Sequence, residues 1–124
     1  MITAIIPTLN EEKFIEEAIA SVSFADEIIV VDSYSEDHTI ELAERHKVKI
    51  VQRKFDNFSS QKNFAIGLAK HDWIYILDAD ERVSPDLKEE IANAVRNPKD
   101  YVGFYIYRSF YFKGTRIKYG GWQT

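Results

Sequence analysis

The chain has 124 residues, of which 45% are hydrophobic and 29% are charged, a composition that fits one globular domain with a modest core and is too short for two. The formal net charge of −4 argues against a broad nucleic-acid-binding surface, and the lack of cysteine excludes disulfides, thiolate metal sites and thiol nucleophiles. No segment approaches the ~20 apolar residues of a membrane span, and the N-terminus lacks the basic segment of a signal peptide. We therefore expect a soluble, cytoplasmic protein.

Five segments are rich in β-forming residues and predict strands. They are Ile2–Pro7, Glu27–Asp32, Lys49–Arg53, Trp73–Asp78 and Val102–Tyr107. The first, second and fourth are continuous apolar runs, which are typical of strands covered on both faces in a parallel sheet. Because helical patterns fill the intervals between them, the sequence predicts a doubly wound α/β fold with a mostly parallel sheet.

Each helical pattern has a polar residue in position to cap its N-terminus. The predicted caps are, in chain order, Asn10, Ser35, Ser59 or Ser60, and Ser84. Asn10 precedes two glutamates, whose charges favour the first turn of a helix. Ser84 precedes a proline, which suits the first helical position. The end of the chain favours a strand or hairpin, with a turn near Lys113.

Ligands of an open α/β sheet bind beside the carboxyl ends of its strands, and three of the four predicted strand ends that lead into helices contain carboxylates. The first of these ends, PTLNEE, contains no glycine. Neither a dinucleotide-binding GxGxxG motif nor a GxxxxGK[ST] phosphate loop follows any strand. The sequence therefore argues against a nicotinamide-dependent dehydrogenase and against a P-loop nucleotidase.

The fourth predicted strand runs directly into an acidic cluster, in the stretch WIYILDADER at residues 73–82. Asp78 and Asp80 lie one residue apart on a loop, an arrangement that suits a hard divalent cation, Mg²⁺ or Mn²⁺, which also binds phosphate oxygens. Helix capping or a solvated turn is the alternative explanation. Because Ser84 already caps the next helix, and because the pair follows a buried strand at the ligand-binding edge, the metal–phosphate interpretation is favoured.

Other polar residues at this edge have both a ligand-binding and a structural interpretation. Asp32 can accept hydrogen bonds from a ribose hydroxyl or a base N–H, or it can form an Asx-turn beside Ser33 and Ser35. Asn10 and Glu11 are equally ambiguous, since Asn10 is also a predicted cap. The sequence leaves these alternatives open.

Two basic residues have the same ambiguity. Lys62 lies in the first turn of its predicted helix, where a cation opposes the helix dipole, so it either contacts a diphosphate or is simply exposed. Arg82 either pairs with Asp80 or meets a phosphate.

Three ordered motifs resemble family 2 glycosyltransferases, which have the GT-A (nucleotide-diphospho-sugar transferase-like) fold. The motifs are IIPTLNEE at residues 5–12, EIIVVDSYSEDHT at 27–39 and DWIYILDADERVSPDL at 72–87. The string DNFSSQKNFAIGLAKHDWIYILDADE, followed by FKGTRIKYGGW, is similar to the lipopolysaccharide-core β-glucosyltransferase branch of that family. The resemblance covers essentially the whole chain and corresponds to the N-terminal portion of such an enzyme.

The resemblance implies roles for the residues at the strand ends. The residues that it implies bind the nucleotide sugar are Pro7, Thr8, Asn10, Glu11, Asp32, Ser33, Lys62 and Asp78. Asp32 would contact the base, Lys62 would lie near the diphosphate and Asp78 would approach the ribose, while Asp80 would hold Mg²⁺ or Mn²⁺. The implied reaction is transfer of a sugar with inversion, with UDP-glucose as the expected donor and a saccharide or glycolipid, such as lipopolysaccharide core, as the acceptor. The metal would neutralise the departing diphosphate.

The chain departs from the family on the acceptor side, where an inverting transferase needs a carboxylate base. The acids that follow Asp80 are Glu81, Asp86, Glu89, Glu90 and Asp100. Only Glu81 is near the site, and it lies on the donor side, so the catalytic base is unknown. We expect residues 1–124 to be the nucleotide-sugar-binding portion of a GT-A domain that transfers sugar poorly or not at all alone.

The residues after Asp100 combine many aromatic side chains with four basic ones and no acid, so their charge is about +4 against about −8 for the rest of the chain. Such a surface can stack on sugars and attract phosphorylated lipid or an anionic membrane, or its aromatic rings can fill the core. Contact with the inner face of a membrane and self-association therefore stay open.

Two other functions fit parts of the pattern. A non-catalytic nucleotide-binding module or remnant would share the donor site without transferring sugar. A phosphatase with Asp78 as nucleophile would also place DxD after a hydrophobic strand, but it needs a later acidic pair at strand ends, which the remaining residues do not offer.

Overall fold

The computed structural model describes residues 1–96 and 110–112, and its strands and helices alternate in the predicted order. In chain order they are β1 (Ile2–Thr8), α1 (Ile15–Ser21), β2 (Glu27–Asp32), α2 (Thr39–Ala43), β3 (Lys49–Gln52), α3 (Phe58–Leu68), β4 (Trp73–Ile76), α4 (Pro85–Arg96) and β5 (Phe110–Phe112). The strand predicted at Val102–Tyr107 and the turn predicted near Lys113 lie outside the described residues.

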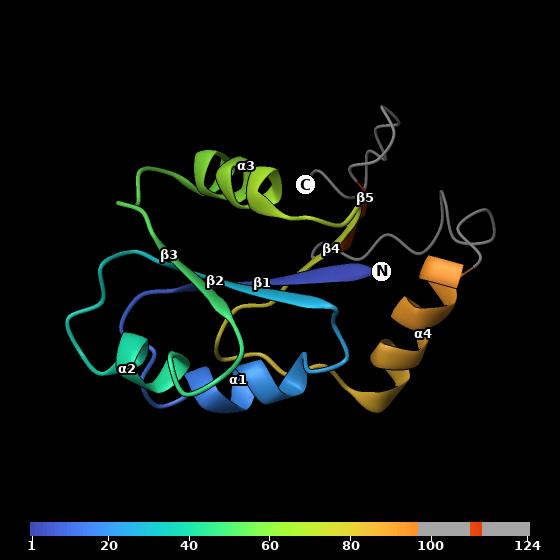
Figure 1. Ribbon diagram of the computed structural model, residues 1–124, viewed down its shortest axis with the longest axis horizontal. Coiled ribbons are helices and arrows are strands. Elements are labelled where there is room, and N and C mark those ends of the chain that lie inside the picture. The colour runs from blue at the N-terminus through green and yellow to red at the C-terminus, as the bar shows by residue number, and fades with distance from the viewer. Residues whose placement is uncertain (97–109, 113–124) are drawn as a thin grey trace.

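The five strands form one sheet in the order β3-β2-β1-β4-β5. β1 pairs in parallel with β2 and β4, β2 pairs in parallel with β3, and β5 runs antiparallel to β4. The predicted doubly wound, mostly parallel α/β sheet is therefore confirmed. The carboxyl ends of the four parallel strands share one edge of the sheet, on the left of Figure 1.

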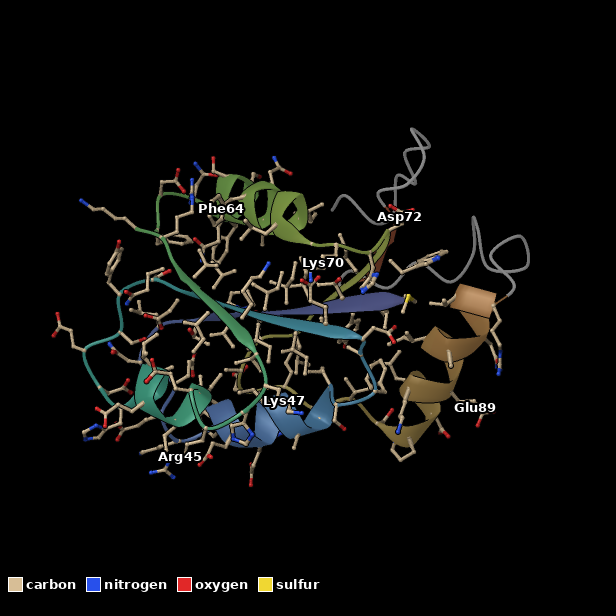
Figure 2. All side chains as sticks on the ribbon, viewed as in Figure 1. Arg45, Lys47, Phe64, Lys70, Asp72 and Glu89 are labelled. Atoms are coloured by element: carbon tan, nitrogen blue, oxygen red, sulfur yellow. The ribbon has the colours of Figure 1, made fainter. Side chains whose placement is uncertain are left out.

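Helices cover both faces of the sheet, which explains the continuous apolar strands (Figure 1). α3 covers one face, where Ile5 packs in a cluster with Ala65, and Figure 2 shows Phe64 on the side of α3 that faces the sheet. α1, α2 and α4 cover the other face, where Ile6 packs in a cluster with Ile91. Successive residues of β1 thus enter different clusters, and burying each isoleucine stabilises the fold by roughly 1.5–3 kcal/mol.

Of the predicted helix caps, only Ser84 is confirmed. Its Oγ accepts a hydrogen bond from the backbone N–H of Leu87 at 3.1 Å, and α4 begins at the following proline. α3 is capped by Asn57, whose Oδ1 accepts a hydrogen bond from the backbone N–H of Ser60 at 2.8 Å. The prediction of Ser59 or Ser60 as that cap is wrong because both residues lie in the first turn of α3.

The predictions of Asn10 and Ser35 as caps are also wrong. α1 begins at Ile15 and α2 at Thr39, and neither helix has a side-chain hydrogen bond at its cap residue. Both predicted caps bind across two loops instead, as described below. Among the described residues, no helix has the length and apolar character needed to cross a membrane.

Candidate functional site

The loops that follow β1 and β2 are joined by reciprocal hydrogen bonds at the carboxyl edge of the sheet. The backbone N–H of Asn10 donates to Ser35 Oγ at 2.7 Å, and the backbone N–H of Glu36 donates to Asn10 Oδ1 at 2.8 Å. Asn10 has a φ of 55°, in the left-handed region that asparagine tolerates better than most residues. Because its side-chain oxygen binds the neighbouring loop, Asn10 is not available to cap α1.

A second set of bonds continues this connection toward α2. The backbone N–H of Glu11 donates to the buried Thr39 Oγ1 at 2.8 Å, and that hydroxyl donates to Asp37 Oδ1 at 2.5 Å. The backbone N–H of Glu12 donates to Asp37 Oδ2 at 3.2 Å. The two loops, at residues 9–14 and 33–38, therefore act as one unit, which we call the loop wall.

Asp32 anchors the loop wall from inside the protein. Its side chain is fully buried, and its carboxylate accepts hydrogen bonds from Thr8 Oγ1 at 2.8 Å, from Ser35 Oγ at 2.5 Å and from the backbone N–H of Ser35 at 2.7 Å. The Gln52 amide lies 3.4 Å away. The structural alternative that the sequence left open for Asp32, a turn beside Ser35, is thus present.

The DADER stretch forms a tight turn after β4 that exposes its two aspartates. Ala79 is buried in the core between Asp78 and Asp80, which are both exposed, and the backbone N–H of Asp78 donates to Glu81 Oε1 at 3.0 Å. Arg82 pairs with Glu17 of α1 at 2.9 Å and donates to the carbonyl of Ala79 at 2.7 Å. Of the two alternatives for Arg82, pairing with Asp80 is thus not what the structure has.

The acidic residues at this edge act on one another electrostatically. Burial raises the pKa of the Glu11 carboxyl above its ordinary value, and the negative charges of Asp80 and Asp78 raise it further. Burial, followed by the charges of Glu81 and Asp78, raises the pKa of Tyr75 in β4 to about 12. The first and fourth strand ends therefore meet in one negative region, as the sequence predicts.

A cavity of about 230 Å³ opens beside this region, between the sheet and the start of α3. Most of the residues that line it are apolar, and its polar lining residues are Gln61, Lys62 and Asp78. An adjoining hollow is lined in part by Pro7, Thr8 and Ser33. Because α3 begins at Phe58, Lys62 lies beyond the first helical turn, so the predicted conflict with the helix dipole is weaker than the sequence indicates.

The cavity also has lining residues that the sequence reasoning missed. Phe55 and Phe58 line both hollows, and Gln61 is a buried amide that lies at their boundary. We call residues 53–62, which carry these three side chains, the helix wall. The only sequence signal for it is the aromatic pair of the stretch FDNF, in a segment whose polar residues otherwise indicate a loop.

The donor atoms at this edge fit a divalent cation that shares its coordination with a bound phosphate. Asp80 and Asp78 offer exposed carboxylate oxygens, the ligand type that Mg²⁺ and Mn²⁺ prefer. The negative charges of Asp80 and Asp78, which add to the effect of burial on the pKa of Glu11, mark a region in which a positive charge would be favourable. Within residues 1–96 and 110–112, no group of three or more histidine, cysteine, aspartate or glutamate side chains is placed to hold a metal alone, so further ligands would come from elsewhere.

The fold and the site define an open α/β protein with a negatively charged ligand site at the carboxyl ends of its strands. The sequence profile of glycosyl transferase family 2 matches residues 3–122. The chain therefore belongs to this family, and the resemblance found in the three sequence motifs is confirmed.

Curated relatives agree with this assignment. An uncharacterized glycosyltransferase of Rickettsia bellii (strain RML369-C) is 44% identical over 108 residues, covering 85% of this chain and 37% of the relative. The lipopolysaccharide core biosynthesis glycosyltransferase LpsC of Rhizobium meliloti (strain 1021) is 29% identical over 118 residues, covering 91% of this chain and 44% of LpsC. The chain thus spans less than half the length of these relatives.

Solved structures agree on the fold. Glucosyl-3-phosphoglycerate synthase from Mycobacterium tuberculosis, in complex with Mn²⁺, UDP and glucosyl-3-phosphoglycerate, matches 64% of this chain and 33% of its own, with 27% identity and a TM-score of 0.58. TarS residues 1–349 of S. aureus, in complex with UDP, matches 78% of this chain and 32% of its own, with 26% identity and a TM-score of 0.60. The GT-A fold that the resemblance implies is therefore confirmed.

Proposed function

We propose that this chain binds a nucleoside diphosphate sugar at the carboxyl edge of its sheet, as the donor-binding portion of an inverting glycosyltransferase. The donor that we propose is UDP-glucose, and the acceptor is a saccharide or glycolipid such as lipopolysaccharide core. One observation carries the proposal: the cavity is lined by both Lys62 and Asp78, and Asp78 lies in the same turn as the exposed Asp80. Both neighbouring structures described above hold UDP, and the glucosyl-3-phosphoglycerate synthase also holds Mn²⁺.

The residues of the site have distinct proposed tasks. Lys62 attracts the diphosphate, Asp78 meets the ribose and Asp80 holds Mg²⁺ or Mn²⁺. When bound, the cation would supply neutralisation of the charge that develops on the departing diphosphate. Asp32 supports the base end by fixing Thr8 and Ser35, because its carboxylate is fully buried and already accepts hydrogen bonds from both residues.

The acceptor side of the reaction needs a base that we do not assign in this chain. Among residues 1–96, the acids near the site, Glu11, Asp78, Asp80 and Glu81, all lie at the donor edge. Sugar transfer is therefore proposed for this portion acting together with an acceptor-side carboxylate. The cytoplasmic location, contact with a membrane face and self-association stay predictions.

Calorimetric titration with UDP tests the donor site directly. We expect binding that requires Mn²⁺ and weakens about tenfold or more in Asp80→Ala, because a lost contact to a charged group costs ~1.5–3 kcal/mol. Asp72→Ala is the matched control, since Asp72 is an exposed aspartate just before β4, away from the carboxyl edge (Figure 2). UDP binding that ignores both Mn²⁺ and the Asp80 substitution would contradict the proposal.

A further inference from the structure

The helix wall presents two phenylalanine rings that the core does not use. Phe55 is 42% exposed and Phe58 is 84% exposed, and their rings meet edge to face with centroids 5.1 Å apart and planes at 70°. Paired exposed rings at the mouth of a cavity are unfavourable in water and mark a binding surface.

The chain holds this aromatic pair in place. Arg53 binds the carboxylate of Asp56 through both terminal nitrogens, at 2.9 and 3.1 Å. Asn57 caps α3 immediately before Phe58. The bidentate ion pair between Arg53 and Asp56 thus fixes the backbone around Phe55, and the Asn57 cap fixes the start of α3 at Phe58. A ligand that covers the two rings therefore orders little additional backbone.

The cavity beside the rings has the character that a flat heterocycle requires. Its lining includes three aliphatic side chains, Ile5, Val31 and Ile76. Gln61, only 6% exposed, also lines it, donates from Nε2 to Ser33 Oγ at 3.2 Å and accepts at Oε1 from Arg53 at 3.5 Å. Each of these bonds uses one of the two hydrogens on Nε2 or one of the two lone pairs on Oε1, so the polar edge of a base can bond with the remaining ones, whereas a purely apolar occupant cannot.

We propose that Phe55 and Phe58 form the stacking surface for the nucleobase of the donor, with Gln61 at the edge of the base. The inference rests on the proposed function, because the diphosphate end of the same ligand would lie toward Lys62 and Asp80. It assigns base binding to the helix wall, while the loop wall, which is anchored by the bonds of the buried Asp32, supports the site.

Titration of matched variants with UDP and with inorganic pyrophosphate, each with Mn²⁺, tests the assignment. We expect Phe58→Ala to weaken UDP binding about tenfold, the typical effect of losing a base-stacking ring, and to leave pyrophosphate binding within about twofold. Phe58→Trp should retain UDP binding because it keeps a flat aromatic face. Phe24→Ala is the control, since Phe24 lies just before the start of β2, away from the carboxyl edge, and lines neither hollow.

The outcomes separate this inference from the proposed function. If the wild-type chain binds no UDP, both fail. If it binds UDP in a manner that needs Mn²⁺ and Asp80, but Phe58→Ala and Phe55→Ala bind UDP as tightly as the wild type, only the stacking assignment fails. Equal loss of UDP and pyrophosphate binding in Phe58→Ala would also overturn it, because the ring would then support the phosphate end.

Discussion

The loop wall and the helix wall of the site differ in how their side chains are bonded and exposed. Asn10 on the loop wall and Asp32, the buried anchor of that wall, are residue types that often bind ligands, but here they bond to the protein itself. On the helix wall, Phe55 and Phe58 look like core residues but face solvent at a cavity. Residue type alone therefore does not show whether a side chain is bonded within the protein or exposed to solvent, whereas burial and hydrogen-bond partners do.

The largest expected effect is the loss of stability on substitution of Asp32, the buried anchor of the loop wall. Asp32→Ala removes the acceptor for Thr8 Oγ1 and for two donors of Ser35, and it should lower the free energy of unfolding by about 3 kcal/mol because buried donors lose their partner. Urea denaturation measures this, with exposed Asp72→Ala as the control expected within ~0.5 kcal/mol. A loss below ~1 kcal/mol would mean that the loop wall does not depend on Asp32.

A smaller effect is expected at the helix wall. Asn57→Ala removes the side-chain cap of α3 and should lower the free energy of unfolding by about 1 kcal/mol. Ser59→Ala, two residues further on, is the matched control and should change it by only a few tenths of a kcal/mol, since alanine favours the helix interior. Thermal unfolding of the two variants distinguishes them, and an equal loss in both would contradict the assignment of the cap.

Relief of backbone strain should change stability in the opposite direction. Tyr34 in the loop wall has a φ of 62°, which is costly for a bulky side chain. Tyr34→Gly should raise the free energy of unfolding by up to ~1 kcal/mol, less the larger chain entropy of glycine in the unfolded state. Asn10→Gly, at a φ of 55°, should instead destabilise, because the bond to Glu36 is lost. Urea denaturation of both variants tests this contrast, and destabilisation by Tyr34→Gly would show that its ring makes contacts worth more than the strain.

The smallest effect concerns the ion pair that fixes Phe55. The hydrogen bond from Arg53 is the main reason why the pKa of Asp56 falls to about 2 from its ordinary 3.8. Because the folded-state pKa is lowered, the contribution of Asp56 to stability is complete above pH 3.8 and is lost as the pH falls through about 2. Arg53→Met should return this pKa toward 3.8, as NMR titration of the Asp56 carboxyl can measure. An unchanged pKa would show that Arg53 does not hold the segment.

The fold was predictable because the sequence patterns that specify it extend over whole segments. Continuous apolar runs at Ile2–Pro7 and Glu27–Asp32 require cover on both faces, and the intervening helices supply that cover whichever residues cap them. The order of the elements along the chain can be predicted from such segment-wide patterns, because it does not depend on any single contact.

The caps and the helix wall were less predictable because they depend on single partners. Asn10 has the right chemistry for a cap, but an acceptor cannot be assigned until the loop carrying Glu36 is placed beside it. Phe58 could not be predicted as a site residue because aromatic residues usually pack in the core. Its ring is exposed because of where α3 begins on the sheet. For Asp80, the metal hypothesis needed only the local spacing of two aspartates after an apolar strand. In the structure, Ala79 between them is buried in the core and both aspartates are exposed.

The central place of β1 in the sheet has a consequence for synthesis. β1 emerges first and pairs with β2 at a separation of 24 residues, Thr3 with Glu27, whereas its other edge meets β4 at a separation of 71 residues, Ile2 with Trp73. Distant pairings form slowly, and an unpaired apolar edge invites pairing with other chains. A nascent chain that has completed β2 but not β4 is therefore the stage most exposed to aggregation, and the stage at which a chaperone would have the most surface to bind.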